Sequence, residues 1–234
     1  MVDQALFLRT LSEFAQTLVR PYEVGDVLYD MTGRLIEVLG VTGAGVSLGE
    51  GDRIRFATGV NEASVRTEEA QEEAQQGPCV QAFRTGEKVL VSDLREVGEG
   101  WDVFREAALG AGFLAVAAIP MKVDSRSLGA LNVYSSTKRA WSSDDVATAT
   151  VLANMATSYI INASELEKAN RTAEQLQQAL ESRIVIEQAK GMVAAQRKIH
   201  PDQAYRVLRQ HARSHNSSLR AVADAVVNLG LRPS

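Results

Sequence analysis

One stretch of this chain, residues 146–190, contains neither proline nor glycine and constrains the fold more than any other feature. Ser142 and Asp145 precede it at the spacing of a capping box, with Asp in place of the usual Glu, which predicts that a helix starts there. About 45 residues at 1.5 Å per residue make a helix roughly 70 Å long. We therefore expect one long helix to connect the regions before and after it.

The middle of this helix carries apolar residues at alternating spacings of three and four, with polar and charged residues between them. These seam residues are Leu166, Ala169, Ala173, Leu176 and Leu180. A heptad seam of this kind indicates a parallel coiled coil between two copies, although a helix packed on its own sheet is the alternative. Ile184 comes four residues after Leu180 where three were due, so the seam drifts beyond that point.

Charge divides the chain into two parts. Residues 181–234 hold nine Lys and Arg and four acidic residues, a net charge of +5, whereas residues 1–180 carry −9. A small basic module joined to a larger acidic one predicts a polyanionic partner for the basic module.

The first 140 or so residues alternate between helical and strand patterns. Two amphipathic helices within residues 2–39 are separated by Pro21 and end at Gly40. We expect hairpins at 43–58 and 114–135, the second with its turn at 124–127 and central to a sheet. The segments between them predict an acidic helix, a short helix and an extended run, at 64–77, 78–86 and 88–94. The fold class predicted is α+β.

The basic module has the pattern of three helices. Pro201 stands at the first turn of a second helix, residues 215–218 interrupt it, and a third amphipathic helix ends at Gly230.

Cations recur on single faces of the first two of these helices. Arg183, Lys190 and Arg197 are spaced by seven residues, and Arg206, Arg209 and Arg213 follow i, i+3 and i+7 with Tyr205 beside them. Guanidinium and ammonium groups suit phosphates and an aromatic ring suits an unpaired base, so these faces predict a nucleic-acid surface. The alternatives are a solvated charged face and a Tyr205 that packs in the core.

Gly191 lies inside the first of these helices, where glycine costs roughly 1 kcal/mol relative to alanine. Ala189 and Gly191 leave the surface around Lys190 without bulk, so either another helix or a sugar-phosphate backbone can approach it. The residues by themselves favour helix packing.

The segments RxxIEQAKGM, PDQAYRVLRQHAR and SSLRAVADAVV resemble the ANTAR antitermination domain over about residues 175–230. The resemblance implies a three-helix RNA-binding unit that, as a dimer, holds two small stem-loops with six-base loops in a nascent transcript. Its signature positions here would be Arg183, Ala189, Lys190, Gly191, Tyr205, Arg209, Ala212, Arg213 and Ser218.

The segments GPCVQAFRTGEKVLVSDL and GFLAVAAIPMKVDSRSLGALNVYSSTKRAWSSDDV resemble a GAF domain. That family has an antiparallel sheet with helices and often a small-molecule pocket, so a small-molecule ligand of unknown identity is an expectation. Together the two resemblances imply a GAF sensor at 1–160, a coiled-coil linker helix at 161–182 and an ANTAR domain at 183–234.

Four residues are candidate sensor positions: Cys79, Trp101, Phe104 and Tyr134. Cys79 follows Pro78 near a helix start, where the helix dipole lowers the pKa of an exposed thiol, but a buried apolar role is the alternative. The three aromatic residues are pocket or core. A single cysteine and three histidines argue against a disulfide and against a metal site.

These observations predict a cytoplasmic homodimeric RNA-binding regulator with no membrane segment. A DNA-binding regulator is the alternative, because a basic helix can also enter a major groove. We do not expect an enzyme, because the chain has one cysteine and no Ser/His/Asp constellation.

Overall fold

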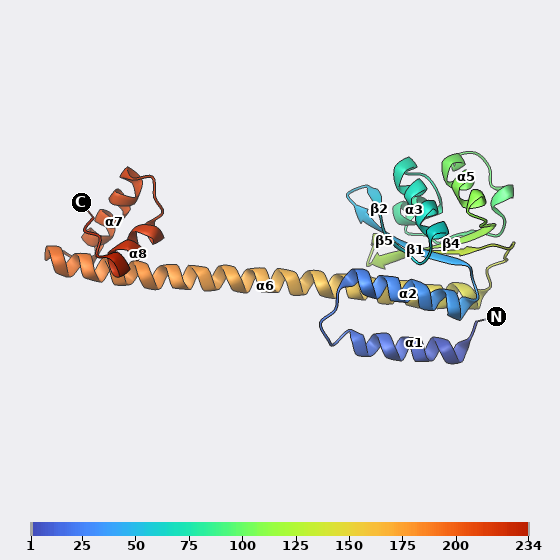
Figure 1. Cartoon of the computed structure of the whole chain (residues 1–234), viewed down its shortest axis with the longest axis horizontal. Coiled ribbons are helices and arrows are strands. Elements are labelled where there is room, and N and C mark those ends of the chain that lie inside the picture. The colour runs from blue at the N-terminus through green and yellow to red at the C-terminus, as the bar shows by residue number, and fades with distance from the viewer. Residues whose placement is uncertain (1, 234) are drawn as a thin grey trace. The chain divides into compact units, whose positions relative to one another are not determined.

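The computed structural model describes residues 2–233, and the chain divides into two compact units, Met1–Ser164 and Glu165–Ser234. The longest helix, α6 (Ser143–Arg197), contributes to both units (Figure 1). It starts where the sequence predicts, since the backbone N–H of Asp145 donates to Ser142 Oγ at 3.1 Å and that of Ser142 donates to Asp145 Oδ2 at 3.2 Å. The helix continues through Gly191 and ends seven residues beyond Lys190.

The first unit is built on a five-stranded antiparallel sheet with strand order β2-β1-β5-β4-β3. The strands are β1 (Gly43–Glu50), β2 (Arg53–Gly59), β3 (Val89–Val91), β4 (Ala115–Val123) and β5 (Arg126–Ser135). Strand β5 is central, as expected. The turn before it is shorter than predicted: Val123 pairs with Arg126, so only Asp124 and Ser125 connect the strands, with Asp124 at φ 52°.

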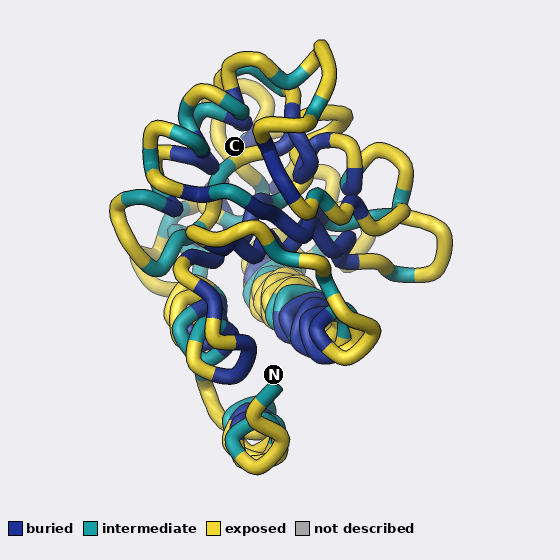
Figure 2. Tube along the Cα trace, turned by 90° about the vertical axis from the view of Figure 1, so that its right-hand side faces the viewer, coloured by how far each residue is buried: buried dark blue, intermediate teal, exposed yellow. Residues whose placement is uncertain are grey.

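One face of the sheet is covered by the first two helices and the start of α6. Helices α2 (Val24–Leu39) and α6 lie against the sheet, and α1 (Gln4–Thr17) lies outside them (Figures 1 and 2). The core is apolar, and Leu28, Leu35 and Leu152 are at most 1% exposed. The Tyr159 hydroxyl donates to the carbonyl of Phe14, which ties α1 to α6.

The opposite face carries α3 (Glu62–Ala74), α4 (Pro78–Thr85) and α5 (Asp102–Gly110). The first two correspond to expected helices, but the sequence reading did not anticipate α5 or the 3-10 turn η1 (Leu94–Glu96). Both are short, and η1 starts at Leu94, the last residue of the run expected to be extended, of which β3 forms Val89–Val91.

The second unit packs α7 (Pro201–Ser214) and α8 (Leu219–Leu229) on the C-terminal part of α6. Alanine, valine and leucine residues from all three helices form its core, among them Ala189, Leu208 and Val226, each at most 1% exposed. His200 caps α7: its Nδ1 accepts from the backbone N–H of Asp202 at 3.3 Å. The three predicted helices are present.

Candidate RNA interface and sensor interior

Three arginines share the exposed side of α7. Arg206, Arg209 and Arg213 are exposed, while Ala204 and Leu208 of the same helix are fully buried in the core of the second unit. Within residues 2–233, none of the three guanidinium groups forms an ion pair or a side-chain hydrogen bond. We call these three residues the guanidinium face, and they are free to bind anions.

Tyr205 adjoins this face with 37% of its surface exposed. It is neither a core residue nor fully exposed, so part of its side chain is accessible to a partner. Arg183 on α6 is also exposed, and it has no ion-pair partner among the described residues.

The other two cations of the α6 stripe are engaged within the chain. Lys190 forms an ion pair with Glu187, and its side chain is 21% exposed. Arg197 donates to the carbonyl oxygen of Pro233. Part of the hydrogen-bonding capacity of these two side chains is therefore used within the chain, whereas that of the guanidinium face is not.

Gly191 faces open space. A Cβ atom placed on it would meet nothing within 4 Å, so packing among the described residues does not require glycine there. The helices of this chain therefore do not account for the glycine, and packing of a helix from another copy stays a prediction. The open surface stays available to an external partner.

Three other predicted site residues are buried in the domain core or cap a helix. Ala189 and Ala212 are buried in the core of the second unit, at 0% and 4% exposure, so their side chains position the helices from beneath the surface. Ser218 caps α8, where its Oγ accepts from the backbone N–H of Ala221 at 3.1 Å. They shape the basic surface without adding charge to it.

The seam residues of α6 lie on the exposed part of the helix. Leu166, Leu176 and Leu180 are 60%, 66% and 60% exposed, and Ala169 and Ala173 are also exposed. Leucines so exposed on a helix are commonly covered by a partner. The coiled-coil dimer remains a prediction.

A buried polar cluster lies between α3 and the sheet. The carboxylate of Glu68 accepts hydrogen bonds from Ser47 Oγ at 3.0 Å, from the Asn132 amide at 2.7 and 2.9 Å, and from the Tyr134 hydroxyl at 2.8 Å. The Gln71 amide donates to Tyr134 at 3.2 Å. We call these five fully buried side chains the polar centre.

Burial dominates the electrostatics of this cluster. It raises the pKa of Glu68 to about 7, even though the hydrogen bonds from Tyr134, Asn132 and Ser47 favour the charged form. A carboxyl group with that pKa is about half ionised at neutral pH.

Cys79 is also buried, at the start of α4. Its backbone N–H donates to Gln71 Oε1 at 3.0 Å, so the polar centre caps this helix. Burial, and next the charge of Glu68, raise the pKa of the thiol, which therefore stays protonated. The condition for a dipole-activated thiol, exposure at the helix start, is not met in this structure.

Of the three aromatic sensor candidates, two lie in the core. Phe104 and Tyr134 are fully buried, and Tyr134 stacks on Phe113 with ring centroids 4.7 Å apart. Trp101 is partly exposed and contacts Phe104 edge-on at 6.3 Å. The structure thus brings Cys79 and Tyr134 to the polar centre and leaves Trp101 near the surface.

Models of two protein families match this chain. A GAF domain model matches residues 22–160, more than half of the sequence, and an ANTAR domain model matches residues 174–227. The chain belongs to the GAF family and carries a C-terminal ANTAR domain. GAF domains are sensor domains and ANTAR domains are RNA-binding antitermination domains, and neither kind is typically catalytic.

Solved structures with the same sheet-and-helix arrangement share only the fold with this chain. They include the GAF domain of Acinetobacter phosphoenolpyruvate-protein phosphotransferase (15% identity, 69% of this chain and 97% of that chain covered, TM-score 0.54). A second is free methionine-R-sulfoxide reductase from Neisseria meningitidis in complex with its substrate (17%, 69% and 92%, 0.53). A third is the A. aeolicus nlh2 GAF domain in an inactive state (15%, 67% and 96%, 0.51). No curated protein matches the sequence.

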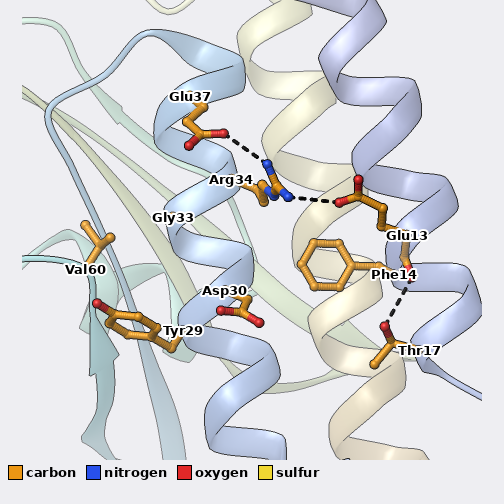
Figure 3. A pocket seen from close by; sticks show the side chains of 9 residues that line it. All are labelled: Glu13, Phe14, Thr17, Tyr29, Asp30, Gly33, Arg34, Glu37 and Val60. Atoms are coloured by element: carbon orange, nitrogen blue, oxygen red, sulfur yellow. Dashed lines mark hydrogen bonds and ion pairs between the residues drawn. The ribbon is translucent and has the colours of Figure 1, made fainter. Parts of the chain in front are cut away.

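The GAF domain has an open pocket of about 440 Å³ between α1 and α2 (Figure 3). Arg34 bridges two carboxylates there, at 3.1 Å to Glu13 and 3.3 Å to Glu37, and Asp30 adds a third. One guanidinium among three carboxylates leaves an excess of negative charge, which disfavours anionic ligands.

Sequence reasoning missed Glu68 and its partners. The buried positions of α3 are Ser64, Thr67, Glu68 and Gln71, spaced as one helical face. All four are polar, so the usual apolar signal for a buried face was absent.

Two further properties concern the described residues. No helix within residues 2–233 combines the length and apolar character that crossing a membrane requires. The same residues contain no group of three or more His, Cys, Asp or Glu side chains placed to hold a metal ion.

Proposed function

We propose that this protein is a dimeric RNA-binding regulator that recognises paired stem-loops with six-base loops in nascent transcripts, under the control of a signal sensed in its GAF domain. The observation that carries the proposal is the guanidinium face of α7, whose three arginines have no partner among residues 2–233 and adjoin the partly exposed side chain of Tyr205. Arginines of this kind contact phosphates and base edges, and an aromatic ring stacks on an unpaired base.

The paired target follows from the proposed dimer. Two copies joined through the exposed leucines of α6 carry two guanidinium faces, and two faces favour two adjacent stem-loops over one. Because α6 runs without interruption from the GAF domain into the ANTAR domain, a change in how the paired helices associate is a sufficient relay of the signal.

The test compares three nucleic acids with the full-length protein: an RNA with two adjacent six-base-loop hairpins, the single hairpin, and duplex DNA of the same sequence. We expect the tightest binding to the paired hairpins. Equal or tighter binding to duplex DNA would instead favour a DNA-binding regulator.

Arginine variants locate the surface. Arg209→Ala should weaken RNA binding by roughly 1–3 kcal/mol if the side chain meets a base, and by less if it meets a phosphate. Arg220→Ala is the matched control, because Arg220 forms ion pairs with Glu181 and Asp224 within the same domain. If both variants lose the same affinity, the guanidinium face is not the binding surface.

A further inference from the structure

The buried face of α3 is entirely polar. Its fully buried residues are Ser64, Thr67, Glu68 and Gln71, and each apolar residue of this helix is partly exposed. A helix normally packs on a sheet through apolar side chains, whose burial holds it there. Of the four, Glu68 and Gln71 form hydrogen bonds with residues outside the helix, so the packing of α3 depends on whether these two polar groups are satisfied.

Among residues 2–233, ionised Glu68 has no countercharge in contact with it. The titratable groups that face it are Cys79 from α4 and Tyr134 from β5, and burial raises the pKa of both, so both are neutral. Strand β1 contributes only the Ser47 hydroxyl. A buried carboxylate with hydrogen bonds but no cation is costly compared with the neutral acid.

The charged groups on the remaining neighbours pair elsewhere. Arg55 of β2 lies 3.1 Å from Glu50 and 3.5 Å from Glu72, and Arg105 of α5 lies 2.8 Å from Asp102. Glu72 of α3 itself accepts from the backbone N–H of Phe56. None of these contacts reaches Glu68.

With Glu68 ionised, the polar centre contains one hydrogen-bond acceptor for which it has no donor. Asn132 Oδ1 is buried and has no hydrogen-bond partner among the described residues. A protonated Glu68 supplies an O–H donor, which Asn132 Oδ1 accepts only after the Asn132 amide turns over, because Nδ2 is the atom that faces the carboxyl group in this structure. The carboxyl group of Glu68 has little room to move while α3 is closed, because it packs against the backbone of β1. A Cβ atom added to Gly45 would lie only 2.7 Å from Glu68 Oε1.

We propose that Glu68 acts as a proton-controlled latch: the neutral carboxyl group holds α3 closed on the sheet, and its ionisation favours release of α3. Opening hydrates the carboxylate, which removes the cost of burying it. The pKa of Glu68, raised to about 7 by burial, puts the change near neutral pH. This inference goes beyond the proposed function and does not depend on RNA binding.

Release of α3 has a second consequence at α4. Gln71 Oε1 leaves the backbone N–H of Cys79, so the start of α4 loses its cap. Cys79, the only cysteine of the chain and 0% exposed when closed, then becomes reachable by a thiol reagent. Its labelling rate reports the opening.

The experiment measures labelling of Cys79 by a small thiol reagent between pH 5.5 and 8, in the full-length wild type, Glu68→Gln and Glu69→Gln. Glu69 is the matched control, because it is the exposed neighbour on the same helix. The thiolate fraction alone raises the rate about ten-fold per pH unit below the thiol pKa, in every variant. We expect the ratio of the wild-type rate to the Glu68→Gln rate to rise at least about ten-fold across this range. The ratio for Glu69→Gln should stay constant.

Hydrogen exchange at matched chemical labelling times locates the opening. Amides of 62–74 should gain exchange in the wild type as pH rises, while amides of β4 stay protected. A constant ratio of wild type to Glu68→Gln, or loss of β4 protection together with that of α3, overturns the proposal. If Glu68→Gln does not fold, the labelling rate of the wild type is the test. A Cys79 labelling rate that rises only as the thiolate fraction does between pH 5.5 and 7 also overturns the proposal.

Discussion

At the scale of single residues, the most informative positions are those whose surroundings contradict their type. Gly191 is a glycine inside a helix with free space around it, and Glu68 is a carboxyl group that is fully buried in the polar centre. Each costs stability where it stands. Such costs are expected at positions that serve binding or switching rather than folding.

Replacing Gly191 with alanine tests what the glycine is for. Gly191→Ala should raise the free energy of unfolding by up to about 1 kcal/mol, because the helix gains propensity and the new methyl group meets no neighbour. It should also weaken RNA binding if a loop backbone lies against this turn. Urea unfolding and RNA titration on the same preparation measure both. A less stable variant would reveal a neighbour that the structure does not contain.

The pH dependence of stability isolates Glu68. Its pKa in the folded protein, about 7, lies above the ordinary value of 4.5, so the stabilisation is fully present below pH 4.5 and is lost as pH rises through 7. The loss corresponds to roughly 3 kcal/mol. The unfolding free energy of the wild type should therefore fall relative to that of Glu68→Gln when both are measured from pH 5 to pH 8. A difference that is flat with pH would show that the folded pKa is not raised.

At the scale of elements, α6 depends on how it begins. Arg139 lies 2.8 Å from the carboxylate of Asp145, which also closes the capping box with Ser142. Burial opposes ionisation of Asp145, but the hydrogen bonds and charge of Arg139 and the backbone N–H of Ser142 outweigh it, so the pKa of Asp145 is lowered.

Asp145→Ala should therefore destabilise the GAF domain by about 2 kcal/mol at neutral pH. Because the folded pKa is depressed, this stabilisation is present above the unfolded value of 3.8 and disappears as pH falls through the folded pKa. Thermal unfolding of wild type and variant should converge in acid. Asp144→Ala, one residue earlier and exposed, should have the smaller effect at neutral pH.

The seam of α6 predicts a separable effect on association. Leu176 is 66% exposed, so Leu176→Gln should leave the helical content of the chain unchanged while weakening the dimer. Sedimentation equilibrium together with circular dichroism measures the two properties. Gln178→Ala, on the outer side of the heptad, should leave association unchanged. Identical sedimentation of Leu176→Gln and wild type would argue against a coiled-coil dimer.

At the scale of the whole molecule, the uneven charge separates the roles of the two domains. The acidic GAF part does not attract a polyanion, and the basic C-terminal part does. Affinity for RNA should therefore fall steeply as salt rises, and Arg206→Ala or Arg213→Ala should each lower the slope of log affinity against log salt by about one if the arginine meets a phosphate. Unchanged slopes would place the phosphates elsewhere.

The sequence by itself determined the α+β class, the course of α6 and the three C-terminal helices. These follow from local rules: periodicity over long segments, a capping pair at Ser142 and Asp145, and proline or glycine at helix ends. The family motifs added the two domain types. The guanidinium face was also visible, because residues on one side of a helix follow from spacing alone.

Only the tertiary structure decided what is buried and what is free. Spacing placed Lys190 and Arg209 in equivalent basic patterns, but contacts pair Lys190 with Glu187 and leave Arg209 without a partner among residues 2–233. The acidic sequence of α3 gave no sign that Glu68 is buried against the sheet, because the residues on β1 and β5 that bond to Glu68 are distant in sequence. The burial and ionisation of a side chain depend on contacts across the fold, and no local pattern encodes them.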